Sequence, residues 1–353
     1  MAASFIVGEH GALIRQRPRG MTTGYASKGA VTAQPNPSGE AFTQIGAGLP
    51  LTVEIAHVYT GKYPHSVFGG SKPLLLTSAI KNLSDTSAAA EAVNYLINSV
   101  QHNTHFTAPS SDQQGTKLVC YVPAVTAVST DITLNLTFEN FPDQLFTNIG
   151  QLFSGAQAIP LFLTNSPYIV GAGTVLKLVQ DIGDALLNGN PDFTTSFSIN
   201  FSDIGVPTQA GYQVFFKKQD DPSAAVESFT FDWKDGLIDP ATKKAYKGDA
   251  PYIVIALDGT QRDSLKAFAP LVASADLLKR FFNITDGGSI PVADILNVVK
   301  AYNDIHYGKD VIGLKKQIAT APAGTDTSSL ERQLDAELAN IQDPDLMTMF
   351  KNN

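Results

Sequence analysis

The sequence predicts a mainly β fold, an antiparallel β-sandwich followed by a helical region. Between residues 193 and 258, segments that alternate apolar and polar residues recur at intervals of about twelve residues, with turn-forming residues between them. After residue 265 the apolar spacing changes to three and four residues, which is typical of helices. Closely spaced strands joined by turns favour an antiparallel sandwich over alternating strands and helices.

This pattern divides the chain into three parts. Residues 1–48 are rich in small residues and proline and predict an extended N-terminal arm, either disordered or ordered across a neighbouring subunit. Residues 49–262 form the sandwich domain, of C2-like or jelly-roll-like type, and residues 263–353 form the helical C-terminal region. Within the sandwich, apolar residues at helical spacing predict helical insertions near 86–100 and 172–188.

The strands of the sandwich are assigned in order from their alternation and their flanking turn residues. They are expected at 51–59, 72–82, 115–125, 129–141, 192–204, 210–219, 226–233 and 250–259.

The C-terminal region contains three amphipathic segments, at 264–283, 291–308 and 328–350, and Pro344 interrupts the last one. Such apolar stripes either pack on the sandwich or dock on a partner. The last segment follows a flexible Pro-Ala-Gly-Thr linker, so it is suited to docking on a neighbour. Its candidate partner-binding residues are Leu330, Leu334, Leu338 and Ile341.

Composition excludes several classes of function. The 353 residues carry a formal net charge of −8, which opposes general binding to nucleic acid because phosphate contacts need clustered lysine and arginine. The single cysteine, Cys120, allows no intrachain disulfide and no zinc site built from several thiolates. The sequence contains no secretory signal and no long apolar run, which predicts a cytoplasmic protein or one exported without a classical signal peptide.

Familiar enzyme motifs are absent from the sequence. It has no phosphate-binding loop, dinucleotide-binding turn, zinc-binding His-Glu-x-x-His helix or Gly-x-Ser-x-Gly elbow. Whether the chain is an enzyme stays uncertain, with the balance toward no catalytic activity. A Cys120 thiol paired with His57 or His65 remains open, as does a hydrolase site assembled from distant residues.

Acidic residues near predicted strand ends provide the sharpest candidate for a site. Calcium takes six to eight oxygen ligands, and loops at one end of a sandwich can supply them. The alternative is that these aspartates only stabilise turns by bonding to the backbone. The calcium candidates are Asp220, Asp221, Asp232, Asp235 and Asp239. No other cofactor is expected.

The stretch "TFDWKDGLIDP" contains three of these aspartates and the only tryptophan. Asp235-Gly236 predicts the two-residue turn of a β-hairpin. Trp233 at this bend either covers one end of the core or is presented to a partner.

The segments "LTVEIAHVY" and "GGSKPLLLTSAIKN" resemble the first two strands of C2-type β-sandwiches, over about thirty residues from 51 to 82. The family includes peripheral-membrane and protein-binding modules, so the resemblance implies a loop that meets a membrane or partner, with Tyr63, Phe68 and Trp233 as its candidates. Lys72 stands where the family has an aspartate. This departure points to a calcium-independent binding scaffold.

Together these features favour a non-enzymatic binding or assembly protein. We expect a structural subunit of a larger complex, held by its arm and C-terminal helix to protein partners or to copies of itself. The alternative is a peripheral-membrane C2-like module of a toxin or immune effector, linked to calcium or not. A hydrolase with a dispersed site is the least favoured reading.

Overall fold

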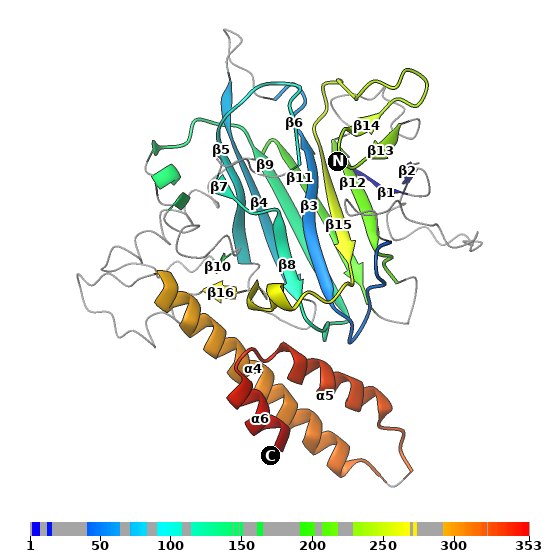
Figure 1. Cartoon of the computed structure of the whole chain (residues 1–353), viewed down its shortest axis with the longest axis vertical. Coiled ribbons are helices and arrows are strands. Elements are labelled where there is room, and N and C mark those ends of the chain that lie inside the picture. Colours follow the sequence, from blue (N-terminus) through cyan, green and yellow to red (C-terminus); the bar gives the residue numbers. More distant parts are fainter. Residues whose placement is uncertain are drawn as a thin grey trace.

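The described part of the chain forms two large, mainly antiparallel sheets and a short hairpin, with a helical region at one end (Figure 1). The computed structural model describes residues 2–7, 13–15, 41–63, 71–82, 90–107, 114–143, 145–147, 149–150, 161–164, 191–201, 207–217, 229–268, 271–273, 292–322 and 324–352. A mainly β fold consistent with a sandwich is therefore confirmed.

The first sheet joins strands that are far apart in the sequence. In the described part of the chain its members are β1 (Ala2–Val7), β2 (Leu13–Arg15), β3 (Leu51–Tyr59), β6 (His105–Phe106), β8 (Leu118–Val122), β12 (Gly211–Lys217) and β15 (Tyr252–Asp258). Their order is β2-β1-β12-β15-β3-β6, and β8 also pairs with β3.

The second sheet faces the first. Over the same described ranges its members are β4 (Lys72–Asn82), β5 (Ala90–Val100), β7 (Gln114–Gly115), β9 (Ser129–Thr137), β10 (Leu161–Thr164), β11 (Phe193–Asn200) and β16 (Leu271–Ala273). The order is β11-β9-β4-β5-β10-β16, with β7 on β5. The pairing of β10 with β16 is parallel, and the other strand pairs described here are antiparallel.

A central core fills the space between the two sheets. On β9, Ile132, Leu134 and Leu136 point into it, while the residues between them point outward. Val53 and Ile255 enter it from the first sheet. Full burial of such side chains stabilises the fold by about 1.5–3 kcal/mol each, which is why alternation predicted these strands correctly.

The first sheet is also buried on its outer face, where a second cluster forms that we call the outer core. The hairpin of β13 (Thr230–Asp232) and β14 (Gly236–Ile238) contributes Phe231 and Leu237 to it. Phe5 of β1 belongs to the same cluster. In the described part of the chain, the first sheet is thus a middle layer between the central core and the hairpin.

The helix predicted near 86–100 is wrong from residue 90 onward, where β5 runs through the second sheet. Tyr95 and Ile97 lie in the central core, whereas Asn94 and Leu96 are buried on the opposite face. A strand buried on both faces has no period of two in its sequence, so its apolar residues fell at helical spacing by coincidence. The insertion predicted near 172–188 lies outside the described residues.

The arm predicted over residues 1–48 is wrong at its beginning. Ala2–Val7 forms β1, which pairs with β12 on one side and with β2 on the other. Phe5 and Val7 are buried in the outer core. Alternation of only six residues was too short to recognise as a strand beside the small-residue composition that follows.

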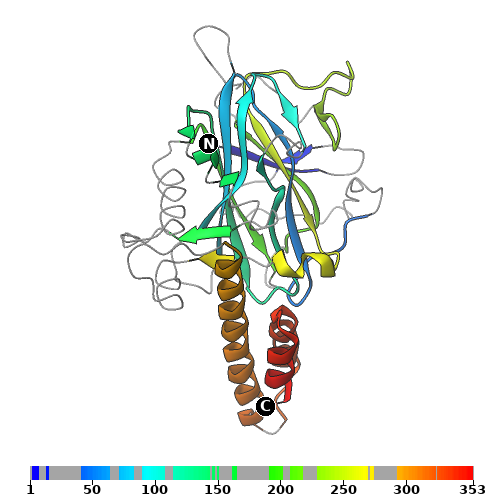
Figure 2. The ribbon, with the colours of Figure 1, turned by 60° about the vertical axis from the view of Figure 1, so that its left-hand side comes forward.

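In the described part of the C-terminal region, helices follow the sandwich and extend away from it, as both views show (Figures 1 and 2). They are α4 (Val292–Thr320), α5 (Ser328–Asn340) and α6 (Pro344–Asn352). The helices predicted from 291 and 328 are confirmed, and the break at Pro344 is the start of α6. The helix predicted at 264–283 is wrong where described, since a 3₁₀ helix at Asp263–Phe268 and then β16 occupy that region.

No helix in the described ranges combines the length and the apolar character needed to cross a lipid bilayer.

Candidate functional site

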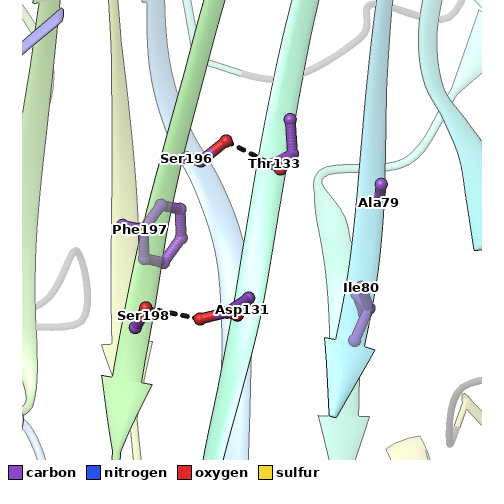
Figure 3. Close-up of a pocket in the computed structure, with 7 residues that line it drawn as sticks. All are labelled: Ala79, Ile80, Asp131, Thr133, Ser196, Phe197 and Ser198. Carbon is purple, nitrogen blue, oxygen red and sulfur yellow. Dashed lines mark hydrogen bonds between the residues drawn. The ribbon is translucent and has the colours of Figure 1, made fainter. Parts of the chain in front are cut away.

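The outer face of the second sheet has a shallow depression of about 370 Å³ (Figure 3). It lies over the ends of β4, β9 and β11, and the outward positions of these strands supply hydroxyl groups. Ser198 donates to the Asp131 carboxylate, and the Thr133 and Ser196 hydroxyls lie 2.8 Å apart. The polar groups of the depression therefore bond to one another across the strands.

This depression has little catalytic capacity. Its described lining residues are Ala79, Ile80, Asp131, Thr133, Ser196, Phe197 and Ser198. None is a histidine or a cysteine, so the serine hydroxyls have no imidazole to activate them for nucleophilic attack. The depression is suited at most to weak contact with a polar ligand.

A group of histidine and tyrosine side chains forms the most unusual polar feature of the outer core. A bulge at Ala56 creates it: Val254 pairs with His57, and the next residue, Ile255, pairs with Ile55. Without this extra residue, alternation would direct His57 into the central core. The bulge instead turns His57 to the outer face of the first sheet, under the β13–β14 hairpin.

The imidazoles of this group are linked to one another. His57 Nε2 lies 3.1 Å from His105 Nδ1, and His105 Nε2 lies 3.2 Å from the Tyr246 carbonyl oxygen. The Tyr252 hydroxyl lies 3.3 Å from the same His105 Nδ1 and accepts the Leu237 N–H at 3.0 Å. The hairpin is therefore bonded directly to the group beneath it.

These contacts fix the tautomers. A carbonyl only accepts hydrogen bonds, so His105 Nε2 carries a proton and its Nδ1 accepts. His57 Nε2 is then the donor, which leaves His57 Nδ1 as a bare acceptor, and this buried atom has no partner among the described residues. Burial lowers the pKa of His57 to about 3, and the neighbouring His105 adds to the effect. Burial also lowers the pKa of His105.

The His57–His105 pair is therefore neutral and structural in character. The His57 side chain is 0% exposed, so no substrate reaches it directly. Cys120 belongs to the central core, on the other face of the first sheet from His57, so these two residues do not form a catalytic pair. Burial raises the pKa of the Cys120 thiol to about 12, which keeps it protonated. His65 lies outside the described residues.

The stretch "TFDWKDGLIDP" is the hairpin that covers this group. Asp232 pairs with Gly236, so three residues form the loop, and the two-residue turn predicted at Asp235-Gly236 is wrong. Asp232 Oδ1 accepts the N–H groups of Lys234 at 2.8 Å and Asp235 at 3.0 Å. Gly236 has a φ of 79°, as the position after such a turn requires.

The described calcium candidates act as turn residues. Asp232 holds the hairpin loop, and Asp239 accepts the Ala241 N–H at 2.9 Å, which lowers the pKa of Asp239. The described residues contain no group of three or more metal-ligating side chains. Asp220 and Asp221 lie outside them, so the calcium site stays a prediction. Of the described candidates, Asp232 and Asp239 already accept backbone N–H groups, and Asp235 lies in the hairpin loop between the paired residues Asp232 and Gly236.

The loop residues predicted to meet a membrane or partner differ in their surroundings. Tyr63 packs on Phe138 with ring centroids 6.0 Å apart, and Lys217 Nζ lies 4.2 Å from the Tyr63 ring centroid. Tyr63 is therefore engaged within the sandwich. Trp233 is 40% exposed at the hairpin tip and is accessible to a partner. Phe68 lies outside the described residues.

The predicted partner helix is α5, and its apolar side is already occupied. Ile341 is buried with Val311 of α4 and Phe350 of α6, and Leu334 and Leu338 pack against this cluster. Leu330 is half-buried. The apolar side that was assigned to a partner thus holds the three helices together within one chain.

A different helix surface is apolar and open. We call it the outer face of α4, and it consists of Val298, Tyr302, Ile305, Lys309, Ile312 and Lys316. Its members are separated by four, three, four, three and four residues, the spacing of a coiled-coil seam. Tyr302, Ile305 and Ile312 are 48%, 52% and 55% exposed. The sequence predicted an amphipathic helix only over 291–308, so the part of this face at Lys309, Ile312 and Lys316 was missed.

The outer face of α4 is basic as well as apolar. Lys309 and Lys316 are exposed, and no exposed residue between 301 and 320 is acidic. Asp304 is buried instead, and its two carboxylate oxygens accept the N–H groups of Gln342 and Asp343 at 2.8 and 2.9 Å. Asp304 is thus turned inward and Asp310 is half-buried, so Lys309 and Lys316 are the exposed lysines that set the charge of this surface.

Comparison with models of protein families gave no match, and no curated protein sequence matches the chain. Its function must therefore be inferred from these surfaces.

Proposed function

We propose that the chain is a non-enzymatic binding or assembly protein, a structural subunit of a larger complex, and that its helical region holds the partner. The observation that carries this proposal is the outer face of α4. Helix α4 projects from the sandwich and carries three large apolar side chains that are about half exposed. Their exposure to water is unfavourable in free energy unless another surface covers them.

The proposal places the contact on other residues than the sequence suggested. Ala2–Val7 pairs within its own sheet, and the apolar side of α5 is buried, so neither is free to hold a neighbour. In the proposal, the outer face of α4 is the surface that binds the neighbour. The sandwich then serves as the body that presents the helices.

The other two functions have less support. The membrane-binding alternative named Tyr63, Phe68 and Trp233. Tyr63 packs on Phe138 and Phe68 lies outside the described residues, so among the described residues Trp233, 40% exposed, is the one that still supports it. For the hydrolase alternative, which needs an accessible base, His57 is unsuitable because it is fully buried and burial lowers its pKa to about 3.

Site-specific photo-crosslinking tests the proposal. Benzoylphenylalanine in place of Ile305 should give a discrete protein adduct in the cells that produce the chain. The matched control replaces Val128, which is 63% exposed on the sandwich, and should give none. If position 305 yields no protein adduct, or both positions yield the same adducts, the proposal is wrong.

A further inference from the structure

The outer face of α4 is a narrow stripe along the helix. At 3.6 residues per turn, its members fall within an arc of about 80°. Small residues border it, with exposed Ala301 and Ala319 on one side and half-buried Gly313 on the other. Small side chains at a contact let two helix axes approach closely. The stripe therefore has the width and the borders that suit one facing helix.

Two lysines stand in the middle of this stripe. Lys309 follows Ile305 and Lys316 follows Ile312, so apolar and basic positions alternate along one seam. Both lysines are exposed, and neither forms an ion pair with a described residue. A lysine in a helix seam packs its aliphatic stem on the facing helix and extends its ammonium group to the border of the contact. A carboxylate at that border is the group that stabilises it.

The described part of α4 does not supply such carboxylates itself. No exposed residue between 301 and 320 is acidic. Asp304 is buried and bonded to the backbone that follows α5. Asp310 is half-buried and acts on Glu337 of α5, so it lies on the covered side of the helix. The carboxylates must therefore come from the partner.

A second copy of the chain does not meet this requirement through its helices. Two outer faces of α4 would bring lysines together with no exposed acidic residue on either face to balance them. The exposed side of α5 carries Arg332 beside Glu331 and Asp335, and it has no large apolar side chain to cover the stripe. The complementary surface thus belongs to a different protein.

We infer that the partner presents an acidic amphipathic helix, with apolar residues at three- and four-residue spacing and Asp or Glu along both borders, which packs on the outer face of α4. The inference rests on the proposed function and names the chemistry of its partner. The contact from Tyr302 to Lys316 is about 21 Å long, so the partner helix has about four turns or more.

A facing helix fits this surface better than an anionic membrane does. A helix that lies on a membrane keeps its lysines on the polar face, away from the apolar side chains that enter the lipid. Lys309 and Lys316 lie between the apolar side chains instead. Seating the stripe in lipid would draw both ammonium groups toward the acyl layer, whereas a helix with acidic borders pairs with them.

Binding of designed peptides to the purified full chain tests the inference, with fluorescence anisotropy as the measurement. The acidic peptide has three heptads, leucine at the seam positions and glutamate along both borders. The basic peptide has the same leucines with lysine along the borders. Wild type should bind the acidic peptide with a micromolar dissociation constant and the basic peptide at least about tenfold more weakly. Equal binding of the two peptides, or no binding of the acidic one up to high micromolar concentration, overturns the inference.

Charge reversal tests which residues set this preference. Lys309→Glu combined with Lys316→Glu should reverse it, so that the basic peptide binds more tightly than the acidic one. Lys234→Glu combined with Lys244→Glu makes the same change in net charge at exposed positions of the sandwich and should keep the wild-type preference. A Lys309→Glu, Lys316→Glu chain that still prefers the acidic peptide shows that the outer face of α4 is not the binding surface.

Removal of the apolar contact tests the seam. Ile305→Ser combined with Ile312→Ser should abolish binding of the acidic peptide with unchanged circular dichroism. Flotation with phosphatidylserine vesicles covers the lipid outcome, and wild type should not float. If wild type floats, this variant does not, and the acidic peptide fails to bind, the surface meets lipid and the inference is wrong.

The outcomes separate this inference from the proposed function. A protein adduct at position 305 in cells, with no preference between the two peptides, leaves the proposed function standing and overturns the acidic helix as its partner. An adduct that disappears when Lys309→Glu and Lys316→Glu are added supports both. The absence of any protein adduct at position 305 overturns both.

Discussion

Asn340 of α5 and Ala124 of the sandwich are joined by two hydrogen bonds. The Ala124 N–H donates to Asn340 Oδ1 at 3.0 Å, and Asn340 Nδ2 donates to the Ala124 carbonyl at 2.9 Å. Asn340 is 1% exposed and Ala124 is 3% exposed. This amide thus pairs with both backbone groups of a residue 216 positions away and fixes α5 to the sandwich.

Asn340→Ala should loosen this attachment. It leaves a buried N–H and a buried carbonyl without partners, which costs about 2–4 kcal/mol. Native-state hydrogen exchange should show faster exchange of α5 amides, with smaller changes in β9 and β11. Gln333→Ala, on the exposed side of α5, is the control and should leave exchange unchanged. Equal α5 protection in Asn340→Ala and wild type would contradict a stabilising role.

Gly236→Ala should destabilise the hairpin strongly. A Cβ at this position would lie 2.3 Å from the Tyr252 hydroxyl oxygen and 2.6 Å from His57 Nε2, and its φ of 79° is unfavourable for alanine. Gly48→Ala is the matched control, since its φ is 73° but a Cβ there meets no atom within 4 Å. Urea unfolding should show a loss of about 1 kcal/mol for Gly48→Ala and a clearly larger loss for Gly236→Ala. Equal losses of stability in the two variants would mean that the hairpin accommodates the added methyl group without further destabilisation.

Whether a strand was predicted correctly from the sequence depends on whether one or both of its faces are buried. β9 and β11 have one buried face, so their alternation was visible and their positions were predicted correctly. β5 is buried on both faces and lost that signal. The bulge at Ala56 has no signature in the sequence, and it alone determines which face His57 occupies. A contact such as His57 to His105 depends on that bulge and could not be predicted.

The helical region shows a related limit. The apolar spacing of α5 was recognised, but a pattern does not say whether its partner lies in the same chain or another. Ile341 is covered from within the chain, whereas Ile305 is not. Only the packing of three helices distinguishes the two.

The buried His57 makes the sandwich sensitive to acid. Its pKa in the folded chain is about 3, against an ordinary value of 6.5, so the unfolded chain binds the extra proton between these pH values. The contribution of neutral His57 to the free energy of unfolding is therefore fully present above pH 6.5. It falls as the pH is lowered toward 3, by about 1.4 kcal/mol per pH unit. Trp233 fluorescence during urea unfolding measures it, because this single tryptophan lies on the hairpin that covers His57.

His57→Gln removes that titration. The stability advantage of wild type over this variant should shrink as the pH falls below 6.5. His102→Gln, at an exposed position, is the control and should follow the wild-type curve. If the curves of wild type and His57→Gln are parallel from pH 7 to 4, His57 does not stay neutral in the folded chain.

Glu337 should give the helical region the opposite pH dependence. Its carboxylate is buried between α5 and the sandwich, where its Oε2 has no partner among the described residues. Burial raises the pKa of Glu337 to about 7, Asp310 of α4 adds to the increase, and a hydrogen bond from Thr126 opposes it. The folded chain thus holds a proton that the unfolded chain releases above about pH 4.5.

Stability from this group is consequently full below pH 4.5 and is lost as the pH rises to 7, by an amount on the order of 3 kcal/mol. Glu337→Gln keeps the shape without the charge, so it should match wild type near pH 4 and exceed it near pH 8. Because His57 titrates in the opposite sense over an overlapping range, global unfolding would mix the two effects. Hydrogen exchange of α5 amides against pH isolates Glu337, with Asp335→Asn as the exposed control. If the α5 amides exchange at the same rate in wild type and Glu337→Gln at pH 8, the Glu337 carboxylate reaches water and stays charged in the folded chain.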